Sequence, residues 1–94
     1  MDIKLMKEKA KAEIDDIFAE VDKLEAKKEY AKSIAKAEYE LKLAELKLKK
    51  LELKAKYEEV INSPKEKLED VKAAFDKSAN HFKQGFKELG SLLE

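Results

Sequence analysis

The sequence has no cysteine and no arginine, and each absence excludes classes of function. Without cysteine the chain can form no disulfide, no cysteine-based metal site and no cysteine nucleophile. Arginine is the usual residue for bidentate contacts to phosphate and guanine, yet all 21 basic residues here are lysine, and 21 acidic residues balance them. Zero net charge without arginine argues against nucleic-acid binding and against strong attraction to an anionic membrane.

Residues that interrupt helices are also scarce. The chain of 94 residues has two glycines, one proline and no threonine. Alanine, glutamate, lysine and leucine are abundant, which is the composition of long helices rather than of sheets. No uninterrupted apolar stretch approaches a membrane span, and early charges such as Asp2, Lys4 and Lys7 argue against a signal peptide. We therefore expect an all-helical protein without stable membrane insertion, located by default in the cytoplasm.

The first predicted helix is long. Residues 2–61 contain no glycine and no proline, and apolar residues recur there at steps of three and four, which predicts one helix over about residues 3–61. Its N-terminal half has mainly one apolar face, the 10–24 stripe. Chains of this size often gain stability by oligomerising, so we expect a homo-oligomer with this stripe as its self-association surface. The 10–24 stripe consists of Ala10, Ile14, Ile17, Val21 and Leu24.

The C-terminal half of this predicted helix is apolar on two faces. One face is the 39–60 stripe, and the other, roughly opposite at about 100° per residue, is the 34–55 stripe. A helix that is apolar on two faces needs two neighbours. The 39–60 stripe consists of Tyr39, Leu43, Leu46, Leu53, Tyr57 and Val60, and the 34–55 stripe of Ile34, Ala37, Leu41, Ala44, Leu48, Leu51 and Ala55.

A turn at residues 62–64 supplies one neighbour from the chain itself. The long helix must end there because Ser63 precedes a proline. Ser63 as N-cap, Pro64 at the first helical position and Glu66 form the pattern of a capping box. A second helix over about residues 64–89 would then fold back to give a helical hairpin of the coiled-coil type. Its predicted packing uses Leu41, Leu48 and Leu51 from the first helix and Leu68, Val71, Phe75, Phe82, Phe86 and Leu89 from the second.

Charge is distributed unevenly along the first predicted helix. Residues 13–25 hold six acids against one lysine, and residues 42–56 hold six lysines against two glutamates. The two stretches are expected to lie side by side in antiparallel helices. The contact could join two chains with unbroken long helices, or it could close within one chain as an antiparallel three-helix bundle with a turn near residues 31–33. The absence of glycine, proline and asparagine near that point favours the unbroken helix.

No arrangement of residues predicts a catalytic, cofactor-binding or metal-binding site. His81 is the only histidine, and it falls on the side of the second helix away from Phe82 and Phe86, where a solvated position is expected. The Asp15–Asp16 pair lies near no histidine and no glycine-rich turn, so we interpret it as part of a solvated helix face. We therefore expect a protein that is not an enzyme and that uses no cofactor.

Four short motifs follow one another along most of the chain. They are Glu13-Ile14-Asp15-Asp16, Leu24-Glu25-Ala26-Lys27, Ala35-Lys36-Ala37-Glu38-Tyr39 and, after a stretch rich in lysine and leucine, Leu68-Glu69-Asp70-Val71-Lys72-Ala73-Ala74-Phe75. This order resembles a group of small, uncharacterised bacterial coiled-coil proteins, some of them described as stress-related. In that group a tryptophan often precedes a Glu-Asp-Leu-Lys sequence in the last helix, and in this chain Lys67-Leu68 occupies the place of that tryptophan. The resemblance implies a helical hairpin and no known activity.

These observations predict a non-enzymatic, self-associating coiled-coil protein with a structural or interaction role, such as a stress-associated scaffold or adaptor. The alternative is an amphipathic lipid-surface protein that opens its hairpin and lays the Phe-rich second helix on a bilayer. Charges from residue 64 onward balance, with six lysines and six acids, and the first helix needs the Phe face as a partner. Both points favour the interaction protein.

Overall fold

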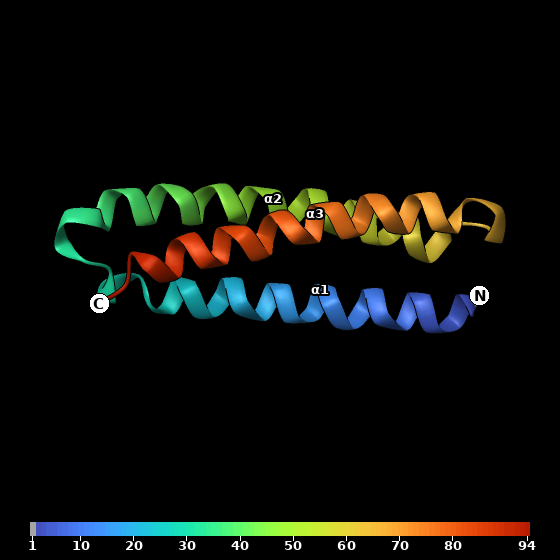
Figure 1. Cartoon of the computed structure of the whole chain (residues 1–94), viewed down its shortest axis with the longest axis horizontal. Helices are drawn as coiled ribbons and strands as arrows, with labels where there is room; N and C mark the ends of the chain where they lie inside the picture. The colour runs from blue at the N-terminus through green and yellow to red at the C-terminus, as the bar shows by residue number, and fades with distance from the viewer. Residues whose placement is uncertain (1) are drawn as a thin grey trace.

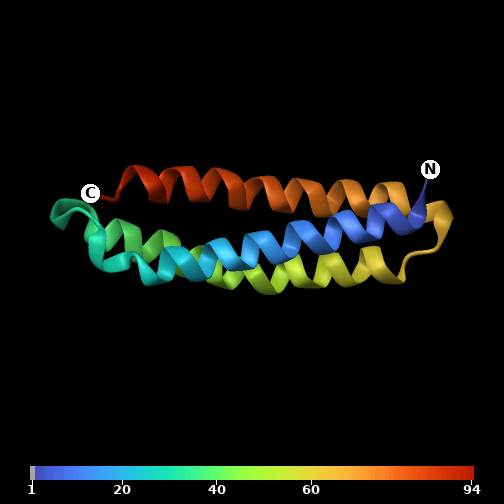
Figure 2. The same ribbon diagram turned by 90° about the horizontal axis from the view of Figure 1, so that it is seen from below.

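The chain folds into an antiparallel three-helix bundle. The computed structural model describes residues 2–94, and along these the bundle measures 50 × 17 × 16 Å. The helices run up, down and up, with the N-terminus and the C-terminus at opposite ends of the bundle (Figures 1 and 2). The elements in chain order are α1 (Ile3–Ala26), the short 3-10 helices η1 (Lys28–Tyr30) and η2 (Ser33–Ala35), α2 (Lys36–Asn62) and α3 (Lys65–Ser91).

The unbroken helix predicted over residues 3–61 is wrong, and the alternative with a turn near residues 31–33 is present. Helix α1 ends at Ala26, and the chain reverses through η1, two extended residues and η2 before α2 begins. The extended residues are Ala31 and Lys32, with ψ angles of 141° and 138°. Among the described residues 2–94 none has a positive φ, so this reversal needs no glycine. The absence of glycine near residues 31–33 therefore does not indicate a continuous helix.

The C-terminal tail holds this reversal in place. The backbone N–H of Lys32 donates to the carbonyl oxygen of Leu92 over 2.9 Å, and the N–H of Glu94 donates to the carbonyl oxygen of Tyr30 over 3.0 Å. These two bonds form an isolated antiparallel bridge between Ala31 and Leu93, where the tail reaches the α1–α2 connection in Figure 1. The extended backbone of the turn thus finds its hydrogen-bond partners at the far end of the sequence.

The 10–24 stripe is buried inside the single chain. All five of its side chains belong to one hydrophobic core together with the 39–60 stripe of α2 and the apolar stripe of α3. The stripe therefore has its partner within the chain, and its predicted use as a self-association surface is wrong for this fold. Burying the side chains of Ile14, Ile17, Val21 and Leu24 stabilises the bundle by roughly 1.5–3 kcal/mol each. Helix propensity favours an unbroken helix through residues 27–35 by only a few tenths of a kcal/mol per residue. Burial of the stripe therefore outweighs the local preference, and the chain turns.

Helix α3 packs as predicted, but on the other face of α2. Leu68, Phe75, Phe82 and Leu89 are buried, and Val71 and Phe86 pack against the core while half-buried. Their partners on α2 are in the 39–60 stripe. The hairpin contacts predicted for Leu41, Leu48 and Leu51 are absent, because all three side chains are exposed. In a three-helix bundle each helix packs against both of its neighbours with the same face. Helices α1 and α3 therefore both contact the 39–60 face of α2.

The capping box predicted at residues 63–66 does not form. Helix α3 begins at Lys65, with Pro64 as its N-cap and no side-chain cap bond. Ser63 is instead the C-cap residue of α2, and its hydroxyl donates to the carbonyl oxygen of Glu59 in the last turn of that helix. Glu66 lies in the first turn of α3 and is exposed. The serine hydroxyl thus satisfies an end carbonyl of α2 rather than an N–H group of α3.

A buried tyrosine fastens the start of α2 to the end of α1. Tyr39 is 0% exposed, and its hydroxyl donates to the carbonyl oxygen of Leu24 over 2.6 Å. The last carbonyls of a helix lack the usual partner from a following turn; the carbonyl oxygen of Leu24 accepts from the backbone N–H of Lys27 over 3.2 Å and also from this phenol. Burial raises the pKa of the Tyr39 phenol above its ordinary value, and the nearby carboxylates of Glu25 and Glu20 act in the same direction.

We expect Tyr39→Phe to lower the free energy of unfolding by about 1 kcal/mol, because it removes this buried hydrogen bond and keeps the ring. Urea denaturation followed by circular dichroism measures the change. The control is Tyr30→Phe, since Tyr30 is exposed and its change should stay within about 0.5 kcal/mol. Equal effects of the two substitutions would contradict a structural role for the Tyr39 hydroxyl.

Candidate interaction surface

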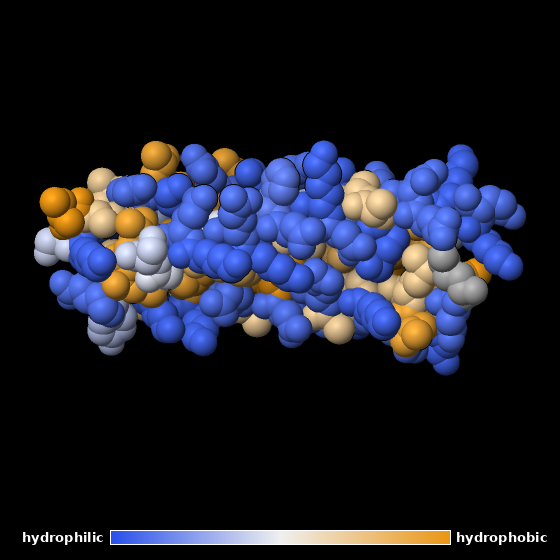
Figure 3. All heavy atoms as spheres, in the orientation of Figure 1, coloured by the Kyte–Doolittle hydropathy of each residue, from blue (hydrophilic) through white to orange (hydrophobic). Residues whose placement is uncertain are grey.

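The 34–55 stripe is the exposed apolar feature of this bundle. Ile34 is 96% exposed, Leu41 64%, and Leu48 and Leu51 are each 72% exposed. The three alanines of the stripe are exposed as well. Figure 3 shows hydrophobic side chains at the upper left of the molecule, along the edge that α2 forms. Single exposed leucines are common, but a continuous row of them on one helix marks a contact surface.

The spacing along this stripe is that of a coiled coil. Its members follow one another at alternating steps of three and four residues, so they occupy the a and d positions of successive heptads. On α2 the large side chains at a and d are Leu41, Leu48 and Leu51, and the remaining places hold alanine; Ile34 extends the stripe into η2, just before α2 begins. The c and f positions of the same heptads hold the 39–60 stripe, which faces the core and is buried except for the half-buried Tyr57. Helix α2 therefore serves the bundle core with one face and offers a narrow coiled-coil face on the other.

The two edges of the 34–55 stripe differ in charge. The edge at heptad position e, which we call the glutamate edge, carries Glu38, Glu45, Glu52 and, one turn beyond the stripe, Glu59. The edge at heptad position g, which we call the mixed edge, carries Glu40, Lys47 and Lys54. All these residues are exposed. Residues at e and g select the partner and the orientation of a coiled coil.

Ion pairs join α2 to α1 beside the mixed edge. The Nζ of Lys47 lies 2.6 Å from an Oε of Glu25, and the Nζ of Lys50 lies 4.0 Å from an Oδ of Asp22. A hydrogen bond from Lys47 holds the pKa of Glu25 below its ordinary value. These pairs confirm that the acidic 13–25 stretch lies beside the basic 42–56 stretch, and they place the contact within one chain. On the side of α3, Lys42 pairs with Glu88 at 2.8 Å.

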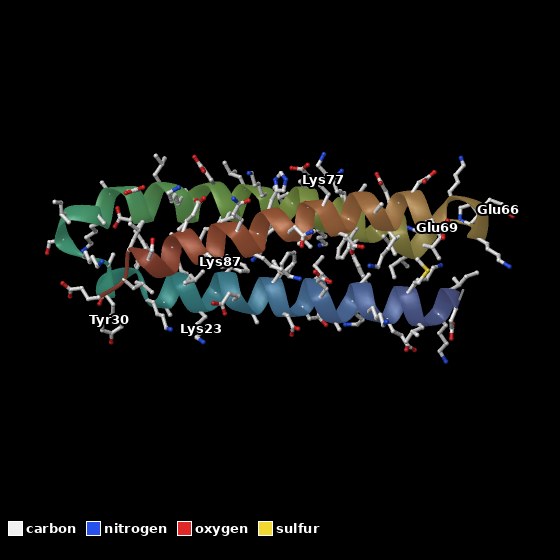
Figure 4. The ribbon with its side chains drawn as sticks, in the orientation of Figure 1. Lys23, Tyr30, Glu66, Glu69, Lys77 and Lys87 are labelled. Carbon is white, nitrogen blue, oxygen red and sulfur yellow. The ribbon has the colours of Figure 1, made fainter. Side chains whose placement is uncertain are left out.

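The remaining surface of the bundle is predominantly charged. Figure 4 shows Lys23 on α1 and Glu69, Lys77 and Lys87 on α3 pointing outward. A shallow groove between α1 and α3 exposes part of Phe86, but charged residues line much of it. No comparably continuous apolar row lies on α1 or α3 within residues 2–94. The 34–55 stripe is thus the best candidate for a functional surface.

The titratable residues do not converge on a chemical site. His81 is exposed, in a groove between α2 and α3 that Lys49, Lys56 and Lys77 also line. Asp15 is exposed and pairs with Lys11 at 2.9 Å. Over residues 2–94 no three histidine, aspartate or glutamate side chains are grouped so that they could hold a metal ion. The statement that the protein is not an enzyme remains a prediction.

Comparison with known proteins returned no family model, no curated protein and no solved structure that matches this chain. The function must therefore be argued from the surface itself. Within the described part of the chain, none of the helices combines the length and the apolar character needed to cross a bilayer.

Proposed function

We propose that this protein is a non-enzymatic structural or interaction protein that self-associates through the 34–55 stripe, which begins in η2 and continues along α2. The exposure of Ile34, Leu41, Leu48 and Leu51 carries the proposal. Full burial of such side chains is worth roughly 1.5–3 kcal/mol each, so a partner helix on this face would gain a large part of that energy. Self-association was predicted for the 10–24 stripe, but that stripe is buried in the core of the single chain. We therefore assign self-association to the exposed 34–55 stripe instead.

The heptad spacing supports a partner that is itself a helix. Alternating steps of three and four residues fit the knobs-into-holes packing of a second helix along the part of the stripe that lies on α2, from Ala37 to Ala55. A small rigid bundle that exposes one such face is suited to the work of a scaffold or adaptor. The resemblance to stress-related bacterial coiled-coil proteins adds the expectation that such an assembly is associated with stress.

The Phe-rich face of α3, which the lipid-binding alternative requires to be free, is packed against α1 and α2 in this fold. Phe75 and Phe82 are buried in the bundle core, so α3 would have to leave the bundle before it could lie on a bilayer. The glutamate edge also disfavours an approach of the 34–55 stripe to anionic lipid. Flotation with vesicles of neutral and of anionic phospholipid separates the two functions, because co-flotation would support the lipid-binding alternative.

The double substitution Leu48→Glu/Leu51→Glu should abolish self-association without unfolding the bundle. Both side chains are exposed, and glutamate is a good helix former, so helix content should be unchanged. Two like charges facing each other across the contact should oppose association. Sedimentation equilibrium over a range of concentrations should show the wild-type mass rising above the 10.8 kDa of one chain, whereas the variant should remain at that mass.

The matched control is Leu5→Glu, which makes the same apolar-to-acidic change at a side chain that is 45% exposed on α1. It should associate like the wild type. A wild-type protein that stays at the mass of one chain at every concentration would overturn the proposed function.

A further inference from the structure

We infer that the partner on the 34–55 stripe is a second copy of this chain, aligned parallel and in register with the first. The inference rests on the proposed self-association and adds its orientation. The stripe faces away from the core that α1 and α3 share with α2, and α2 forms one margin of the bundle in Figure 1. Two bundles can therefore meet along α2 with their other helices on the outside.

An antiparallel pair is opposed by the charges along the stripe. In that orientation each edge meets the same edge of the partner, e against e and g against g. The glutamate edge would then face itself, with acid against acid over its whole length, because its four members are all glutamate. On the other side the mixed edge would place Lys47 opposite its own copy, and only the two contacts between Glu40 and Lys54 would be attractive. Like charges held opposite each other across a helix contact are destabilising.

A parallel pair brings unlike charges together. Each g residue then meets the e residue of the partner's next heptad. Lys47 faces the partner's Glu52, and Lys54 faces the partner's Glu59; the two-fold axis repeats both contacts. One contact, Glu40 with the partner's Glu45, is repulsive. Attractive contacts thus outnumber repulsive ones two to one, and the heptad layers stack each leucine on its own copy.

The Lys54–Glu59 contact is the better of the two for a test. Lys47 already pairs with Glu25 of its own chain, so a change there would disturb the bundle. Lys54 and Glu59 are exposed and take part in no ion pair within residues 2–94. In the same helix they are five residues apart and do not face each other. Charge reversal at either position therefore acts on the contact between chains.

The test is a charge swap. Lys54→Glu alone puts two glutamate–glutamate contacts into a parallel dimer, and Glu59→Lys alone puts in two lysine–lysine contacts. Each variant should self-associate about tenfold more weakly than the wild type at low salt. An equimolar mixture forms a heterodimer in which each contact again joins lysine to glutamate, so association should return to the wild-type level. A mixture that associates no better than its components would overturn the parallel arrangement.

Disulfide crosslinking reports the orientation independently, and the absence of native cysteine removes background. In a parallel dimer Ala37→Cys and Ala55→Cys should each crosslink with their own copy. An antiparallel dimer would instead place residue 37 opposite the partner's residue 55, so only a mixture of the two variants would crosslink. The positions are about 27 Å apart along one helix, far beyond disulfide reach. Mixed crosslinks alone would overturn the orientation but keep the proposed function, whereas a monomeric wild type would overturn both.

Discussion

The double substitution Ile17→Asp/Val21→Asp is expected to unfold the whole chain rather than to release α1. Both side chains are almost fully buried between α2 and α3. An aspartate placed there would lie among the apolar side chains of the core, and burying a charge in such surroundings costs several kcal/mol. Two such costs approach the total stability expected for a domain of this size, about 5–14 kcal/mol. Far-ultraviolet circular dichroism should show loss of most of the helix at every protein concentration.

The control for this prediction changes the exposed side of the same helix. Ala12→Asp/Ala19→Asp introduces the same two charges at exposed positions, and it should cost the lower helix propensity of aspartate plus weak repulsion from acids one turn away such as Asp15 and Asp16, about 2 kcal/mol in total. A variant at Ile17 and Val21 that kept about two thirds of the helix would show that α2 and α3 fold without α1. That result would contradict a single cooperative core.

Phe82→Ala should lower the free energy of unfolding by about 3–5 kcal/mol, the usual cost of truncating a fully buried phenylalanine. The ring is 1% exposed and lies 6.1 Å, centroid to centroid, from that of Phe86 in a tilted arrangement. The loss therefore includes the cavity and the contact between the two rings. Urea denaturation at one fixed protein concentration measures it, since the midpoint should fall while the slope stays the same.

Leu5→Ala is the comparison for Phe82→Ala, because it also truncates a large apolar side chain but one at the surface. Its effect should stay below about 1 kcal/mol. Similar small losses for both variants would mean that α3 is not packed against α1 and α2 in solution.

Several features of the fold followed from local patterns. Helix α3 carries one apolar stripe, so the pattern identified its buried residues, and the proline at position 64 marked where α2 ends and α3 begins. The charge asymmetry between residues 13–25 and 42–56 correctly predicted which stretches lie together. The apolar residues of the candidate interaction surface were also visible as a stripe. Each of these features depends on the residues of a single helix or on the net charge of a short stretch. They can therefore be predicted without knowing how the rest of the chain folds.

The location of the first turn and the role of each α2 face were decided only by the tertiary structure. The turn at residues 27–35 contains no glycine or proline, and two of its backbone hydrogen bonds are made with the tail at Leu92 and Glu94, more than fifty residues away in sequence. Both faces of α2 carry leucine at helical spacing, so hydrophobicity alone could not choose between them. Volume separates them: the 39–60 stripe includes Tyr39 and Tyr57, whereas the 34–55 stripe includes three alanines. The bulkier face fills the space between α1 and α3, because a core stabilises a fold only when it is filled without voids. The thinner face is left outside, where a second helix can approach closely.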